Sequence, residues 1–195
     1  MQTPIQAGKQ LAYKYLGTDP KLARRFEHSI AVGDLMSKVA RRIAQRNPEL
    51  GIDAELCEFI GYTHDIGYSV ADEKHEVHTM DILKREYFDP KLARKAMHGQ
   101  LVEQFGEKEG NIEQYLPSGI EGIILTYCDM SVRTGEPVTI RERAAEIIER
   151  VRAIPTMPAE LKRDIEENMQ KALPRFERYE RIVLALAGVE SVKEF

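Results

Sequence analysis

Residues 56–67 have the sequence LCEFIGYTHDIG, an apolar stretch that ends in the polar pair His64-Asp65. Asp53 precedes the stretch as a typical helix N-cap, and Gly67 is a typical terminating residue, so we expect one buried helix here. A buried carboxylate beside a buried imidazole is costly unless the two are paired or bind a metal ion. The doublet therefore predicts a polar site at the edge of a helical core.

The segments on either side also predict helices. Asp19-Pro20 and Asp89-Pro90 each place a capping residue before a proline at the first helical position, and Thr139 with Glu142 forms a capping box. Pro174 is expected to kink or break the last helix. No strand-like alternation persists, so the predicted helices cover 4–16, 20–46, 53–66, 76–87, 90–105, 118–133, 139–153 and 158–186. The expected fold is all-α: one domain over residues 1–154, and a C-terminal helical extension over 155–195 that packs on the core or mediates oligomerisation, such as a homodimer.

Composition limits the classes of protein to consider. The 195 residues are 43% hydrophobic and 31% charged, which is typical of a globular domain. The net charge of −4 argues against bulk nucleic-acid binding. Cys57 and Cys128 lie in apolar segments, which indicates reduced core residues. The chain shows no N-terminal signal, and the apolar run 182–187 is too short to cross a bilayer, so we expect a soluble cytoplasmic protein without a membrane partner.

Two more polar residues interrupt apolar helices. Asp129 lies within GIILTYCDMSV (122–132), and His28 lies beside the apolar stripe of the long helix. Each has an ordinary alternative, because a lone histidine is more often structural and a lone aspartate can cap the next turn. Together with His64 and Asp65 they supply two imidazoles and two carboxylates from three helices, which predicts a metal site in a helical bundle. These donors suit manganese, iron, zinc, nickel or cobalt.

The order of these residues, H…HD…D, resembles the signature of the HD-domain superfamily of metal-dependent phosphohydrolases. Residues 64–67 match the HDIG form of the doublet, and RFEHS at 25–29 is similar to a segment of deoxynucleotide triphosphohydrolase members. The resemblance spans about residues 20–150 and implies a helical HD-domain bundle. Members with two metals carry two more histidines before the last aspartate, which implies His78 and His98 as further ligands and one or two divalent ions.

His75 is assigned a different place. It lies in a polar loop with Asp72, Glu73 and Lys74, so we expect it to be exposed or at most at the edge of a pocket. The sequence HEVH at 75–78 does not satisfy the HExxH metalloprotease motif, because its two histidines are three residues apart instead of four.

Basic residues near the motifs are candidates for binding phosphate. Arg133 follows Asp129 by four residues, so on a continuous helix both would share a face, and we expect Arg133 to act in catalysis and in substrate binding. Arg25 lies one helical turn before His28 and is expected to bind substrate. Lys74 follows the doublet in a loop where some family members place a catalytic basic residue; its alternative is a solvated surface charge.

The resemblance implies hydrolysis of a nucleotide or another small phosphate ester by metal-activated water, with Asp65 or a nearby carboxylate as proton acceptor. Tyr68 stands directly after the doublet motif, where cyclic-dinucleotide phosphodiesterase members have lysine, which argues against that branch. Two alternatives stay open. A di-iron oxygenase on the same fold uses the same ligand types, and a non-catalytic nucleotide-sensing module would usually have lost some of them.

Overall fold

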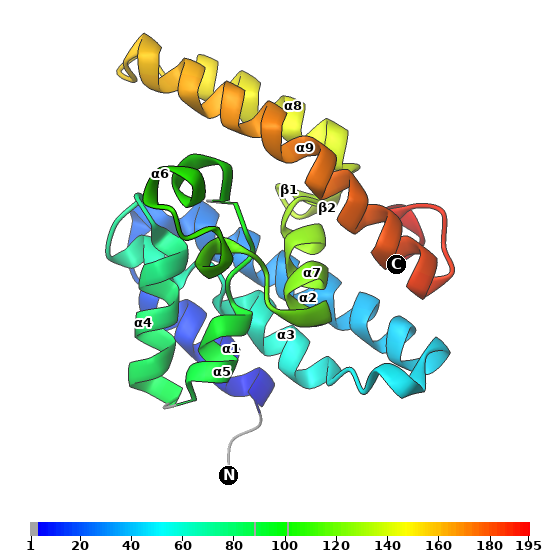
Figure 1. Cartoon of the computed structure of the whole chain (residues 1–195). Coiled ribbons are helices and arrows are strands. Elements are labelled where there is room, and N and C mark those ends of the chain that lie inside the picture. The colour runs from blue at the N-terminus through cyan, green and yellow to red at the C-terminus, as the bar shows by residue number, and fades with distance from the viewer. Residues whose placement is uncertain (1–3, 88, 101) are drawn as a thin grey trace.

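The computed structural model describes residues 4–87, 89–100 and 102–195, and helices account for most of them (Figure 1). The helices are α1 (Pro4–Ala12), α2 (Ala23–Arg46), α3 (Ala54–Thr63), α4 (His75–Tyr87), α5 (Pro90–Lys95), α6 (Glu107–Glu109), α7 (Gly119–Asp129), α8 (Ile140–Arg152) and α9 (Ala159–Ala187). Short 3₁₀ or π turns cover Tyr13–Gly17, Pro20–Leu22, Pro48–Leu50, Ile66–Ser69, Val102–Gly106, Ile112–Tyr115 and Val192–Glu194. The two strands, β1 (Val132–Arg133) and β2 (Glu136–Pro137), form one small antiparallel hairpin. The predicted all-α class is confirmed.

The centre of the fold is the pair α2 and α3, with α1 packed against α3. The predicted apolar stripe of α2 is buried, including Met36, Val39 and Ile43. The two helices approach closely at a pair of glycines, because a Cβ on Gly61 would lie 2.6 Å from the Cα of Gly33. This close crossing fixes the end of α3, and with it the His64-Asp65 doublet, against the middle of α2.

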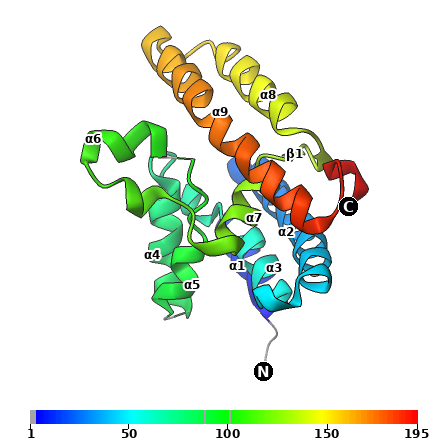
Figure 2. The same cartoon turned by 45° about the vertical axis from the view of Figure 1, so that its right-hand side comes forward.

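The C-terminal helices form an antiparallel pair, α8 and α9, that lies across α2 and α7 (Figures 1 and 2). The end of α9 is tied to the end of α2, since Arg42 Nε donates to the Ala187 carbonyl at 3.0 Å and Asn47 Nδ2 donates to the Leu186 carbonyl at 2.9 Å. Pro174 lies inside α9 without ending it. The extension therefore packs on the core, while the homodimer stays a prediction. No helix among the described residues is both long and apolar enough to cross a membrane.

Two predicted helices end earlier than expected, and both ends shape the site. The helix expected to reach residue 105 stops at Lys95, and the chain then turns through Gly99, whose φ of +75° favours glycine. The helix expected to reach residue 133 stops at Asp129. Thr134 and Gly135 follow with φ of +51° and +84°, and they form the tight turn between β1 and β2. Local backbone conformation thus ended both helices.

Candidate metal centre

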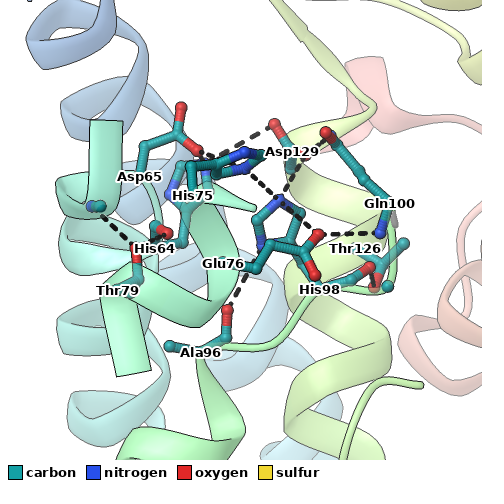
Figure 3. Close-up of polar contacts among 12 residues, drawn as sticks. His64, Asp65, His75, Glu76, Thr79, Ala96, His98, Gln100, Thr126 and Asp129 are labelled. Atoms are coloured by element: carbon teal, nitrogen blue, oxygen red, sulfur yellow. Dashed lines mark hydrogen bonds and ion pairs between the residues drawn. The ribbon is translucent and has the colours of Figure 1, made fainter. Parts of the chain in front are cut away.

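Six imidazole and carboxylate side chains converge where the helices of the core meet. Figure 3 shows His64, Asp65, His75, His98 and Asp129. The six come from segments far apart in the sequence: His28 on α2, His64 and Asp65 directly after α3, His75 at the start of α4, His98 in the irregular segment after α5, and Asp129 at the end of α7. All except His28 are less than 5% exposed. The fold thus gathers one cluster of metal-type donors.

The cluster contains two groups of donor atoms that share one carboxylate. His28, His64 and Asp65 place one ligand atom each within 4.8 Å of one another, and so do Asp65, His75 and His98. Asp129 lies between the groups: its Oδ1 is 2.7 Å from His28 Nε2, and its Oδ2 is 3.8 Å from His98 Nε2. Asp65 therefore belongs to both donor groups.

The orientation of the imidazoles fits a metal ion. Nδ1 of His64 bonds the Gly61 carbonyl at 2.8 Å, which leaves Nε2 facing the cluster. That Nε2 atom is buried and has no hydrogen-bond partner among the described residues, although Asp65 Oδ1 lies 3.3 Å away. Nε2 of His75 and Nε2 of His98 also face each other at 3.4 Å. His64 Nε2, a buried ring nitrogen without a hydrogen-bond partner, is a donor that a bound metal would satisfy.

A cleft of about 270 Å³ opens at the cluster and reaches the helix pair α8 and α9. Asp65, His75 and Asp129 line its inner end. Arg25 from α2 and Arg143 and Arg150 from α8 line it with positive charge. Its other polar lining residues are Tyr68, Asp72, Gln100, Gln104 and Asn168, and its apolar wall consists of Ile147 and Val151 from α8 and Ile165, Met169, Ala172 and Phe176 from α9. The C-terminal extension therefore builds part of the wall of the site.

The sequence profile of the HD domain matches residues 25–154, which are 130 of the 195 residues. The chain belongs to the HD-domain family. This membership agrees with the helical fold and with the histidine and aspartate cluster, because HD domains bind divalent metals. It indicates a metal-dependent function of the hydrolase type. Neither a curated protein nor a solved structure matches the chain significantly.

Electrostatics in this HD domain favours metal binding. Burial opposes the protonated form of His64, but the negative charges of Asp65 and Asp129 outweigh it and raise the pKa of His64 to about 9. Burial lowers the pKa of His75 to about 3, so this ring is neutral at pH 7. Burial also acts to raise the pKa of Asp65, but the charges of His64 and Arg25 hold it below its usual value. The carboxylates are thus ionised and attract a cation.

Neighbouring polar residues hold His98 in place. The Thr126 hydroxyl donates to the His98 carbonyl at 2.5 Å, and Glu76 Oε1 lies 3.2 Å from His98 Nε2. The Gln100 backbone N–H donates to the same Glu76 oxygen at 2.9 Å, and the Gln100 side chain donates to Asp129. Sequence reasoning missed Glu76 and Gln100, since Glu76 looks like one more member of an exposed charge run. Such partners outside the ligand set orient metal ligands.

The prediction that His75 is exposed is wrong: only 3% of it is exposed, and its ring stacks on Tyr68 with centroids 4.0 Å apart. A signal was present, because His75, Thr79 and Ile82 share one helical face, and the other two are also buried. His78, the predicted ligand, lies three residues further along α4 and is partly buried. Within the described residues it belongs to neither donor group. The structure places His75 where His78 was expected.

Of the three basic residues predicted to bind phosphate, one lies at the cleft and two do not. Arg25 lies beside the cluster, with Nη1 3.4 Å from Asp65 Oδ2, and it lines the cleft. The prediction that Arg133 shares a helix face with Asp129 is wrong, because α7 ends at Asp129 and Arg133 is exposed on β1. The Lys74 ammonium bonds Glu109 Oε1 at 2.5 Å. Of the described residues that line the cleft, the cations are Arg25, Arg143 and Arg150, so the structure brings neither Arg133 nor Lys74 to it.

Proposed function

We propose that this HD-domain protein is a metal-dependent phosphohydrolase that acts on a small phosphate ester of the nucleotide class. The support is the cluster of six donors around Asp65 at the inner end of a cleft that arginines line. His28, His64, Asp65 and Asp129 would hold one ion, and His75 and His98, with Asp65 shared, a second. Bound ions of this kind lower the pKa of water and polarise phosphoryl oxygens.

The arginines of the cleft orient the phosphate and stabilise its charge. Arg25 lies 3.4 Å from Asp65 Oδ2 and can contact the phosphoryl group at the metal centre, while Arg143 and Arg150 line the cleft from α8 and can contact further phosphate oxygens of the ester. Donors placed in this way stabilise the negative charge that develops during transfer. In this proposal they take the role that the sequence had suggested for Arg133.

A proton acceptor is also needed, and Asp72 fits better than Asp65. The pKa of Asp65 is held below its usual value by His64 and Arg25, after burial is overcome, so its carboxylate is a weak base. Asp72 is exposed and lines the same cleft. We therefore place Asp65 among the metal ligands and assign the proton of the attacking water to the Asp72 carboxylate.

The outer half of the cleft suits the organic part of the ester. Ile147, Ile165, Met169 and Phe176 supply an apolar wall, and Asn168 adds an amide that donates and accepts hydrogen bonds. An apolar wall with few polar groups is typical of small-molecule sites. A nucleobase, which has planar faces and polar edges, matches this lining.

The first test measures metal content by elemental analysis of untagged protein purified without chelators. We expect two equivalents of a divalent transition metal. Asp65→Ala should lose both with the helical fold retained, because Asp65 belongs to both donor groups. His75→Ala should lose one, whereas His78→Ala, three residues further along α4, is the matched control and should bind like the wild type.

The second test measures phosphate release from nucleoside mono-, di- and triphosphates with each metal. Release that depends on metal and is lost in Asp65→Ala would support the proposal. Metal-replete protein that hydrolyses no phosphate ester would contradict it. Two irons with dioxygen consumption would favour the oxygenase alternative, and tight nucleotide binding without turnover would favour a sensing module.

A further inference from the structure

A second hollow, of about 240 Å³, lies beside the metal cleft and is strongly basic. Its lining consists of Lys21 from the turn before α2, Arg24, Arg25, Glu27 and His28 from the start of α2, Thr134 and Gly135 from the β-turn, and Arg143 and Arg150 from α8. Five of these side chains are cationic at neutral pH and one is a carboxylate. We refer to this space as the basic hollow.

The basic hollow and the metal cleft have three residues in common. Arg25, Arg143 and Arg150 line both. Arg143 and Arg150 are seven residues apart on α8, which places them on one helix face, toward Arg25 on α2. The three guanidinium groups therefore stand at the boundary between the metal centre and the basic hollow.

Arg143 has unused hydrogen-bonding capacity in a buried position. Only 8% of the residue is exposed, and its Nη1 donates to Glu146. Its Nε–H has no hydrogen-bond partner within the described part of the chain. A buried cationic donor without a partner is costly, and an anion in either hollow would supply the missing acceptor.

Arg150 is in a similarly unbalanced environment. Its Nε lies 3.5 Å from Glu146, the same carboxylate that Arg143 contacts. Burial lowers the pKa of Arg150, and the positive charges of Arg143, Arg25 and Arg24 lower it further, against the attraction of Glu146. Arg143 and Arg150 share one carboxylate and have Arg25 and Arg24 nearby, so their positive charge is only partly balanced, and a multiply charged anion would offset it.

We propose that Arg143 and Arg150 bind a second phosphate group, with Arg25 at the boundary between the two hollows, so that the ligand of this protein is a polyphosphate ester with one phosphate at the metal centre and the next in the basic hollow. The first half of this statement rests on the proposed function. The second half depends on α8, which carries none of the H…HD…D residues. A polyphosphate matches the pair of hollows because its phosphates are linked and each carries charge.

Binding of inorganic pyrophosphate to the metal-free protein tests the second phosphate site without any catalysis. We would remove metal by chelation and dialysis and measure binding by calorimetry for wild type, Arg150→Gln and Arg141→Gln. Arg141 is the matched control, because it lies on α8, its side chain is 77% exposed, and it pairs with Glu177 outside both hollows. We expect Arg150→Gln to weaken binding by about tenfold or more, the typical effect of losing a charged hydrogen-bond donor. Arg141→Gln should bind like the wild type.

The metal-loaded protein supplies a second measurement. The ratio of kcat/KM for a nucleoside triphosphate to that for the monophosphate should fall by about tenfold in Arg150→Gln and stay constant in Arg141→Gln. Tighter binding of a nucleoside diphosphate than of pyrophosphate would indicate that the organic part is also recognised. Equal pyrophosphate affinity of wild type and Arg150→Gln, or no binding to the metal-free wild type, would overturn the second site. If the metal-loaded wild type releases no phosphate but the metal-free wild type binds pyrophosphate more tightly than Arg150→Gln does, only the proposed hydrolysis is contradicted.

Discussion

Gly67→Ala should damage both the fold and the metal centre. Gly67 ends the HDIG sequence, and its backbone N–H donates to the Thr79 hydroxyl at 2.9 Å, while that hydroxyl donates to the His64 carbonyl at 2.8 Å. Through this contact α4 packs against the turn that carries His64 and Asp65. Glycine is needed here because of this close approach.

The size of the effect follows from the space available. A Cβ on Gly67 would lie 1.9 Å from the His75 carbonyl oxygen and 2.6 Å from the Thr79 amide nitrogen. Contacts of a real Cβ essentially never fall below 3.0 Å, so the backbone of His75 would have to withdraw by about 1 Å. Overpacking of this kind costs about 1–3 kcal/mol, and a lost buried hydrogen bond adds about 1 kcal/mol. We expect a loss of about 3 kcal/mol and a Tm lower by about 6–12 °C.

The assay combines thermal unfolding with metal analysis. Because His75 moves with its backbone, Gly67→Ala should lose the ion held by Asp65, His75 and His98 before the other one. Gly106→Ala is the control, since the nearest atom to its added Cβ is 3.3 Å away. A Gly67→Ala protein with the Tm and metal content of the wild type would refute the link between this glycine and the site.

Two further predictions concern pH and the core. The pKa of His64 is raised to about 9 in the folded, metal-free protein, so His64 is protonated at pH 7 and metal binding must release this proton; metal affinity should rise as pH increases toward 9, and calorimetry that finds no such dependence would contradict the assignment. The raised pKa of His64 also makes the stability of the metal-free protein depend on pH. The stabilising contribution of protonated His64 is complete below about pH 6.5 and is lost as pH rises through about 9. Chemical unfolding should therefore show a less stable metal-free protein at about pH 9 than at about pH 6. Tyr62→Phe removes a hydroxyl that contacts Asp34 and Glu58 at 2.6 and 2.9 Å and should lower the free energy of unfolding by about 1–2 kcal/mol. Its metal content should match the wild type, and a loss of metal would show that this part of the core is coupled to the site.

The helix α9 of the C-terminal extension lies outside the family match but lines the cleft. The family match ends at residue 154, whereas α9 begins at Ala159 and lines the outer half of the cleft. Arg175 fixes α9 to the segment that follows His98, because its Nε and Nη2 donate to Glu103 at 2.8 and 2.6 Å. The extension therefore forms part of the cleft wall, in addition to covering the core.

Local sequence was sufficient for the helix starts and for part of the metal centre. Asp53 caps α3 by accepting two backbone N–H groups, and Thr139 forms the predicted capping box with Glu142, since such bonds join residues within one turn. His64, Asp65 and Asp129 were identifiable because each is a polar residue in an apolar helix. That contrast is visible without knowing which helices pack together.

Tertiary structure decided the rest, because it depends on which helix faces meet. His75 and His78 are three residues apart, and only the packing of α4 against the turn after α3 directs His75 to the cluster and leaves His78 outside it. Arg133 lies outside the cleft because α7 ends at Asp129 and the chain continues into β1, whereas Arg143 and Arg150 line the cleft from a helix that no motif marks. Sequence spacing fixes neighbours within a turn of helix; contacts such as the one between Arg25 and Asp65, 40 residues apart, form only when burial of the apolar faces brings their helices together.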